Sequence, residues 1–223
     1  MQGYIILYSR QGNFLIFEKR EEAFFFHGSN GSPSAIFPPD GIPITNGPGK
    51  FAFPGGAINS GEEPFKGCLR EFREECGNAI SFGYLPANQP QSLLNLNNLI
   101  IDTSRYDILY NQLNTVGSNY TTLYLEFSND DLRQIQNIIV TTNFEEANQA
   151  RRDIHYNEIK NYDSIFQYYP FCPLDDELGQ VELWNLIREV NEIRALGRDR
   201  ETDWYYNMIV FLANQILQLN IHY

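Results

Sequence analysis

The sequence has little positive charge. Lysine and arginine together number 16 against 28 aspartates and glutamates, which gives a formal net charge of −12, and only four of the cations are lysines. Proteins that bind nucleic-acid backbones or anionic membranes need clustered cations. We therefore expect neither duplex nucleic acid nor a membrane among its partners. An acidic protein can still act on phosphates where a metal ion neutralises the local charge.

Cysteine, histidine and long apolar runs are also scarce. Three cysteines without CxxC spacing and three dispersed histidines argue against a disulfide framework or a zinc site. Nowhere do 18 apolar residues run together, and the N-terminal segment lacks the basic stretch of a secretory signal. We expect a soluble, cytoplasmic protein, with specialised secretion left open.

The chain is rich in apolar and aromatic residues. Its 223 residues are 43% hydrophobic and include 16 phenylalanines and 14 tyrosines, enough for the core of one substantial domain. Segments with strand and helix patterns interleave without strict βαβ repetition, which predicts an α+β fold built as a mixed sandwich. The expected strands are 4–9, 14–18, 50–53, 79–84, 106–110 and 121–127.

Helices and one long loop complete the predicted organisation. The loop at 28–49 is rich in glycine and proline. The expected helices are 63–76, 128–139, 186–196 and 203–219, while 140–180 gives no clear pattern apart from an acidic loop before a last strand at 183–184. We predict a domain over 1–184 and a helical extension over 185–223, packed on that domain and offering a possible homodimer interface.

Three glutamates on the first predicted helix form the most informative pattern. Glu71, Glu74 and Glu75 have i, i+3 and i+4 spacing, so their carboxylates gather on one face and repel each other unless a cation lies among them. Mg²⁺ or Mn²⁺ prefers such oxygen ligands. An ordinary solvated helix face, with Arg70 and Arg73 as ion-pair partners, is the alternative.

Neighbouring residues extend this interpretation. Gly67 lies on the same face, where its missing side chain would leave room for an anion. Arg70 can orient a glutamate through a bidentate pair. The turn at Gly55 and Gly56 lets a backbone carbonyl point towards the same metal. The two cysteines of this helix, Cys68 and Cys76, fall on its apolar arc and are expected in the core.

The wider pattern from 56 to 78 resembles the signature box of the Nudix hydrolase family. Only the last position departs from it, because Asn78 stands where the family has an aliphatic residue. The fixed positions that match are Gly56, Glu62, Arg70, Glu71, Glu74, Glu75 and Gly77.

This resemblance implies an α/β/α sandwich with a mixed sheet and Mg²⁺-dependent hydrolysis of a nucleoside diphosphate linked to another group. It implies that Glu74 and Glu75 bind metal together with the Gly56 carbonyl. Glu71 would be a further ligand or the base that activates water. Arg70 would hold these side chains in place, whereas Glu62 and Gly77 would have structural roles, Glu62 bracing the loop against the helix.

Many members of the family add one acidic residue from a distant loop. Glu177 is the first candidate and Glu182 the second, since both lie near the last expected strand. Glu145 and Glu146 are weaker candidates. An ordinary acidic loop is the alternative for Glu177 and Glu182.

The sequence leaves the substrate open. The window 93–96, where family subgroups carry secondary signatures, holds none of them. A nucleotide sugar or an ADP-ribose-like compound is the leading interpretation, with the 28–49 loop and the 140–180 region forming the pocket or a lid. A non-catalytic module that senses a nucleotide is the main alternative. A prenyl-diphosphate isomerase, which would need a Cys and Glu pair, is a third.

Overall fold

The structure is a computed structural model that describes residues 1–26, 41–83, 94–95, 98–102, 108–115, 118–156, 158 and 162–217. Most of the predicted 28–49 loop lies outside these residues. The same holds for Leu93 and Leu96 of the subgroup window and for the end of the last predicted helix.

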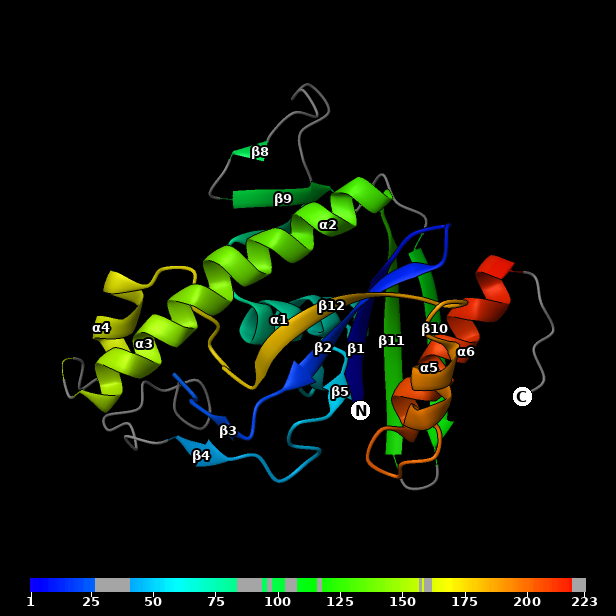
Figure 1. The fold of residues 1–223 in the computed structure, drawn as a ribbon, viewed down its shortest axis with the longest axis horizontal. Helices are drawn as coiled ribbons and strands as arrows, with labels where there is room; N and C mark the ends of the chain where they lie inside the picture. The colour runs from blue at the N-terminus through cyan, green and yellow to red at the C-terminus, as the bar shows by residue number, and fades with distance from the viewer. Residues whose placement is uncertain are drawn as a thin grey trace.

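A mixed sheet forms the centre of the described chain (Figure 1). Strand β1 pairs in parallel with β11 and antiparallel with β2, while β10 and β12 pair antiparallel with β11 and β2. Two short strands, β5 and β6, pair with β2 and β1. The bounds are β1 Gln2–Tyr8, β2 Asn13–Lys19, β5 Phe51–Ala52, β6 Gly55–Ala57, β10 Ile108–Thr115, β11 Ser118–Glu126 and β12 Leu178–Asn185.

Smaller sheets flank this centre. Strand β3 (Glu22–Ala23) pairs with β4 (Ile42–Pro43), so the described part of the predicted loop contains a short strand. A second sheet joins β7 (Ile80–Gly83), β9 (Asn98–Asp102) and β8 (Leu94–Asn95).

Helices cover both faces of the central sheet. Helix α1 (Pro64–Cys76) approaches the sheet at Gly3, where an added Cβ would lie 2.8 Å from the Cys68 Sγ. Helix α6 (Asp203–Leu217) packs Tyr205 against Tyr4, with ring centroids 5.6 Å apart. Because successive residues of a strand face opposite sides, α1 and α6 lie on opposite faces. The mixed sheet with its helices confirms the predicted α+β class.

A long helical rod crosses the molecule (Figure 1). Helix α2 (Asn129–Ile138) begins after Ser128, whose hydroxyl accepts a hydrogen bond from the Asp131 amide as an N-cap. It continues without a break through the π-helix η3 (Ile139–Phe144) into α3 (Glu145–His155), and α4 (Tyr162–Tyr168) follows. The apolar residues of this segment show no clear helical period because a π-helical turn shifts the periodicity in mid-helix.

The C-terminal helices join the main core. Helix α5 (Val190–Leu196) begins four residues later than predicted, whereas α6 begins at Asp203 as predicted. Met208, Ile209 and Leu212 are buried in the same cluster as β1 and β2. The Tyr124 hydroxyl donates to the Met208 carbonyl at 3.1 Å. Among the described residues, no helix is long and apolar enough to cross a membrane.

Candidate active site

Helix α1 is fixed at both ends by residues that suit those positions. Pro64 occupies the first turn, where its missing amide costs nothing. Gly77 ends the helix with φ 87° and ψ 176°, and an added Cβ would lie 2.4 Å from the Phe171 carbonyl oxygen. Only glycine readily adopts this conformation. The Asn143 side chain of η3 donates to the Cys76 carbonyl.

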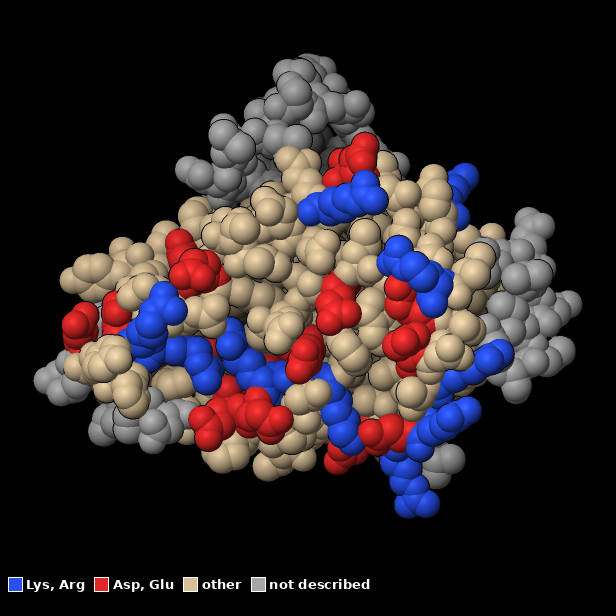
Figure 2. All heavy atoms as spheres, viewed as in Figure 1, with Lys and Arg blue, Asp and Glu red and all other residues tan. Residues whose placement is uncertain are grey.

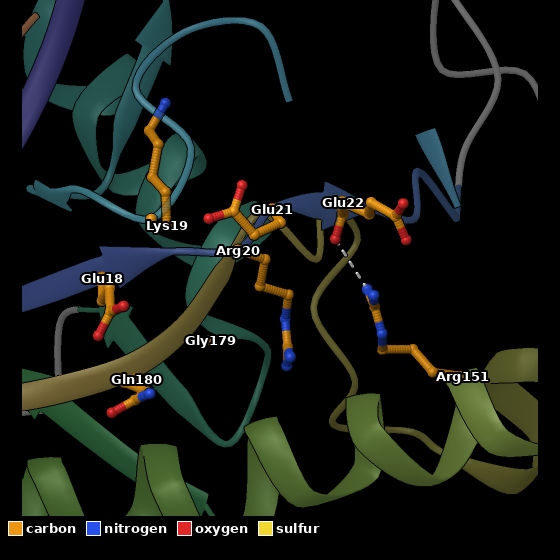
Figure 3. Close-up of a pocket in the computed structure, with 9 residues that line it drawn as sticks. Glu18, Lys19, Arg20, Glu21, Glu22, Arg151, Gly179 and Gln180 are labelled. Atoms are coloured by element: carbon orange, nitrogen blue, oxygen red, sulfur yellow. Dashed lines mark hydrogen bonds between the residues drawn. The ribbon is translucent and has the colours of Figure 1, made fainter. Parts of the chain in front are cut away.

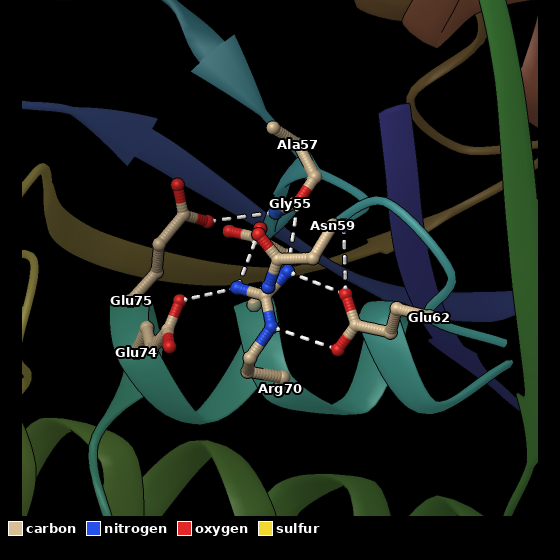
Figure 4. A network of polar contacts seen from close by, with 8 residues as sticks. Gly55, Ala57, Asn59, Glu62, Arg70, Glu74 and Glu75 are labelled. Carbon is tan, nitrogen blue, oxygen red and sulfur yellow. Dashed lines mark hydrogen bonds and ion pairs between the residues drawn. The ribbon is translucent and has the colours of Figure 1, made fainter. Parts of the chain in front are cut away.

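Arg70 is the hub of a network of carboxylates on this helix (Figure 4). Its Nε and Nη2 donate to the two oxygens of Glu62, both at 2.9 Å. Its Nη1 lies 2.8 Å from Glu71 Oε1 and 2.7 Å from Glu74 Oε2. Nη2 also donates to the Ala57 carbonyl at 2.7 Å. One guanidinium therefore binds three carboxylates and one carbonyl of β6.

Glu62 connects the loop after β6 to the helix. Its Oε2 accepts the Asn59 amide at 2.9 Å, in addition to the two bonds from Arg70. The hydrogen bond with Arg70 is the main cause that lowers the pKa of Glu62. The carboxylate is therefore held ionised between the loop and α1.

Glu71 is buried against the glycine turn. An added Cβ on Gly56 would lie 2.4 Å from Glu71 Oε2, so a side chain at this position would displace the carboxylate. Burial raises the pKa of Glu71 to about 7, with the charges of Glu74 and Asp175 acting in the same direction and Arg70 opposing it. At neutral pH the side chain is therefore able to take up or release a proton.

Glu75 lies deeper, with 6% of its surface exposed. The Gly55 amide donates to its Oε2 at 2.7 Å. Burial, followed by the negative charge of Glu177, raises its pKa well above the ordinary value, while Lys19 and the Gly55 amide lower it. The fold thus buries the Glu75 carboxylate at a position where the nearby positive charge does not balance the negative charge.

Strand pairing decides which carbonyl faces these glutamates. Gly3 pairs with Gly56, between two pairs joined by amide-to-carbonyl hydrogen bonds of 3.0 Å, Ile5 to Pro54 and Ile58 to Met1. Hydrogen-bonded pairs alternate along an antiparallel ladder, so the Gly56 amide and carbonyl point to Gly3. Those of Gly55 point the other way, towards Glu75. This register disagrees with the expectation for the Gly56 carbonyl and favours that of Gly55.

The loop before β12 reaches the same cluster. The Asp175 amide donates to the Glu74 carbonyl at 2.8 Å, which attaches this loop to the end of α1. Glu177 accepts from Lys19 Nζ at 3.4 Å, and its charge acts on Glu75. The charge of Asp175 acts on Glu71. The sequence singled out Glu177 but missed Asp175, for which the acidic triplet 175–177 was the available signal.

The other distal candidates lie in different surroundings. Glu182 is exposed on β12 and accepts from the Trp184 indole at 2.8 Å. Glu145 pairs with Arg152 at 3.2 Å on the surface of α3. Glu146 accepts the Phe171 amide at 2.6 Å. None of these contacts brings the three side chains to the α1 carboxylates.

For α1, the structure contradicts the prediction for Gly67 and confirms the prediction for the two cysteines. The space beside Gly67 is filled, because an added Cβ would lie 2.3 Å from the Ile58 Cδ1 and 3.2 Å from a Glu62 oxygen. Gly67 therefore admits the loop rather than an anion, which corrects the prediction. Cys68 and Cys76 are fully buried free thiols, and burial raises the pKa of Cys68 to about 12. They are core residues as expected.

A pocket of about 330 Å³ opens where β2 leaves the sheet (Figure 3). Lys19 and Arg20 point to opposite sides of this strand, Lys19 reaching Glu177 and Arg20 reaching Asn148 of α3. Lys19 thus links the pocket to the carboxylate cluster. The lining consists of Glu18, Lys19, Arg20, Glu21, Glu22, Gly49, Arg151, Gly179 and Gln180.

Basic side chains elsewhere lie among acidic ones. On the face shown in Figure 2, the lysines and arginines of the lower half lie next to aspartates and glutamates. Partly exposed ion pairs such as Lys50 with Asp199 at 2.6 Å and Lys50 with Glu201 at 2.5 Å contribute to this pattern.

The residues present fit a hard divalent cation. Glu71 and Glu75 are buried carboxylates, and the negative charges of Glu177 and Glu71 both raise the pKa of Glu75. Oxygen donors of this kind suit Mg²⁺ or Mn²⁺. Within the described chain, no three His, Cys, Asp or Glu side chains already stand in metal-binding geometry. Glu71 and Glu74 are instead directed to Arg70.

Comparisons with known proteins give limited similarity. Neither a protein-family profile nor a curated protein matches the chain. An Ap4A hydrolase from C. elegans, solved as a binary complex, is 14% identical over 58% of this chain and 67% of its own, with a TM-score of 0.28. A MutT protein from Methanosarcina mazei Go1 is 17% identical over 57% and 61%, also with a TM-score of 0.28.

Proposed function

We propose that this chain is a metal-dependent pyrophosphohydrolase of the Nudix type, cleaving the diphosphate of a nucleoside diphosphate linked to another group. The observation that supports it best is the pair of buried glutamates of α1, Glu71 and Glu75, which pack against Gly55 and Gly56 of β6. Glu75 is held by the Gly55 amide, and Glu71 packs where Gly56 has no side chain. A merely solvated helix face would leave both carboxylates in water.

Glu71, Glu74 and Glu75 would hold a Mg²⁺ or Mn²⁺ ion, with Glu177 and the Gly55 carbonyl as further donors. When bound, such an ion supplies a water of lowered pKa and neutralises the charge that develops on the diphosphate. The Gly55 amide fixes the direction of Glu75, and Arg70 fixes those of Glu71 and Glu74. No covalent nucleophile is required.

Glu71 has two possible roles, as a ligand or as the base that removes a proton from the attacking water. The two roles differ in measurable ways. If Glu71 is a ligand, Glu71→Gln weakens Mg²⁺ binding together with turnover. If it is the base, Glu71→Gln abolishes turnover while Mg²⁺ affinity stays close to that of the native protein.

The charged pocket beside Lys19 is our candidate for the group attached to the diphosphate. Its lining offers carboxylates, guanidinium groups and an amide, which hydrogen-bond to hydroxyl groups. Among the lining residues that the structure describes, none carries an aromatic ring on which a base would stack. These features favour a sugar or ribose moiety, in agreement with a nucleotide sugar or an ADP-ribose-like substrate.

The test is product release from a panel of nucleoside diphosphate derivatives with Mg²⁺ or Mn²⁺. We expect turnover by the native protein and its loss in Glu75→Gln. Glu63→Gln is the matched control, because Glu63 precedes the same helix, its side chain is 61% exposed, and it pairs only loosely with Lys66 at 3.4 Å. Ligand binding without turnover under all these conditions would support the non-catalytic sensing module instead.

A further inference from the structure

The guanidinium of Arg70 contacts two separate groups of partners, one on each side (Figure 4). One side of the guanidinium, Nε and Nη2, is occupied by Glu62 and the Ala57 carbonyl. The other side, Nη1, is shared by Glu71 and Glu74 at 2.8 and 2.7 Å. The first side anchors Arg70 to the loop, whereas the second binds the carboxylates that the proposed metal needs.

We propose that Arg70 is the internal counterion of this cluster in the metal-free protein, and that Glu71 and Glu74 leave its Nη1 when a divalent cation binds. The inference rests on the proposed function and adds a regulation of the same site. The metal ion and Arg70 Nη1 would then compete for Glu71 and Glu74, and this competition would set the free metal concentration at which the site fills.

The charge of the cluster explains why an internal counterion is needed. Glu71 and Glu75 are both buried, and Asp175 and Glu177 add further negative charge from the opposite loop. Carboxylates gathered in this way repel one another at low dielectric. Arg70 Nη1 compensates the charges of Glu71 and Glu74 through short, charge-assisted hydrogen bonds.

The same bonds oppose metal binding. A carboxylate oxygen that accepts from Nη1 presents less of its lone-pair density to a metal, and the guanidinium itself repels a second cation. Glu62 belongs to the loop after β6 and Ala57 ends β6 itself. Neither residue lies on the carboxylate face, so their bonds to Arg70 persist when Nη1 is vacated. Arg70 therefore stays beside the site, and its Nη1 can pair with Glu71 and Glu74 again when the metal dissociates.

Competition and orientation predict opposite signs for one variant. If Arg70 competes, Arg70→Gln tightens Mg²⁺ binding, by about tenfold for the loss of one partly buried charge pair. If Arg70 mainly orients the glutamates, as the family resemblance implies, the same variant weakens binding. Isothermal titration of Mg²⁺ distinguishes the two, and unchanged or weaker binding overturns the inference.

Arg73→Gln is the matched control. Arg73 lies on the same helix, and its Nη2 reaches Asn78 at 3.5 Å outside the cluster. The variant removes the same formal charge as Arg70→Gln but no contact to the carboxylates. Because solvent and salt screen such a charge, we expect less than about a twofold change in Mg²⁺ affinity. Equal tightening in both variants would assign the effect to net charge and overturn the inference.

A measurement on the native protein covers the case in which Arg70→Gln fails to fold. Nitrogen-15 spectra of the arginine side chains should show the Arg70 Nη signals shifting during a Mg²⁺ titration, while Arg70 Nε and the Arg73 signals change little. Absence of any shift at Arg70 Nη, at saturating Mg²⁺, contradicts the inference.

Failure of the inference and failure of the proposed function give different results. Mg²⁺ binding that is lost in Glu75→Gln and weakened in Arg70→Gln leaves the hydrolase intact and removes only the competition. Native protein that binds no Mg²⁺ removes both.

Discussion

Two buried clusters of acidic side chains and arginine lie close together in this molecule but have opposite charge balance. In the first, Asp176 is fully buried and receives Arg20 Nε at 3.0 Å and Arg151 Nη1 at 2.8 Å, two cations for one carboxylate. In the second, Arg70 alone contacts Glu62, Glu71 and Glu74. The first cluster is complete within the protein, whereas the second has a deficit of positive charge that a ligand can supply.

Three consecutive residues connect the two clusters. Asp175 and Glu177 exert their charge on Glu71 and Glu75, while Asp176 between them meets the two arginines. The chain turns at Asp176 and Glu177, just before β12, and in this way one acidic triplet serves both environments. Acidity in the sequence therefore does not define a function until the partners on each side are known.

The largest expected effect is at Glu75. Glu75→Gln should lower turnover by about a thousandfold, because several kcal/mol of metal-based stabilisation are lost. The free energy of unfolding of the metal-free variant should not fall, since the change removes a buried charge with little compensation. Steady-state kinetics and urea unfolding measure the two. A large loss of stability would place Glu75 with the structural cluster instead.

Asp176→Asn should show the reverse behaviour. Two partly buried arginines would lose their counterion, which costs about 3 kcal/mol in the free energy of unfolding. Mg²⁺ affinity should change by less than about threefold, since Asp176 has no contact with the α1 carboxylates in the described contacts. Urea unfolding and isothermal titration check the pair of results. Loss of Mg²⁺ binding would contradict the separation of the clusters.

Glu177→Gln tests the distal acid. We expect about a tenfold fall in kcat/KM at limiting Mg²⁺, because one of the negative charges around Glu75 is lost. Glu182→Gln is the control, with no change expected, because its carboxylate is exposed and bound to Trp184. Equal effects of the two substitutions would remove Glu177 from the site.

The pH dependence of stability tests Glu71. Its folded-state pKa of about 7 lies above the ordinary 4.5, so between these values the folded state binds more protons than the unfolded state. Its contribution to stability is therefore present below pH 4.5 and is lost as the pH rises to 7, by about 2 kcal/mol. Metal-free Glu71→Gln should lack this fall. Unfolding curves measured from pH 4.5 to 8 that coincide in shape would contradict the assignment.

The smallest effect is expected in the charged pocket. Gln180→Ala should raise KM by about threefold with kcat unchanged, because one amide contact to the attached group is lost. The kinetics of the preferred substrate of the panel measure this. An equal effect on a nucleoside triphosphate, which lacks that group, would show that the pocket does not select it.

Much of this architecture was predictable from local pattern. Helix α1 begins and ends within one residue of the prediction, since Pro64 and Gly77 mark its ends and the Glu71, Glu74 and Glu75 spacing marks its face. Strands β1 and β2 also match closely, because their apolar residues are continuous and a short turn joins them.

What the sequence could not show depends on partners from distant segments. The strand character of Gly55 and Gly56 comes from pairing with β1, and this pairing also turns the Gly56 carbonyl away from the glutamates. The filled space beside Gly67 comes from the loop residue Ile58. The division of the acidic triplet between two clusters required the positions of Arg20 and Arg151, which are separated by 131 residues of chain.

The central claim is that the carboxylates of α1 hold a divalent cation. Isothermal titration of Mg²⁺ into the native protein, Glu75→Gln and Asp176→Asn tests it most directly. The account predicts saturable binding to the native protein, its loss in Glu75→Gln and its persistence in Asp176→Asn. Native protein without saturable Mg²⁺ binding, or binding that survives in Glu75→Gln, would contradict it.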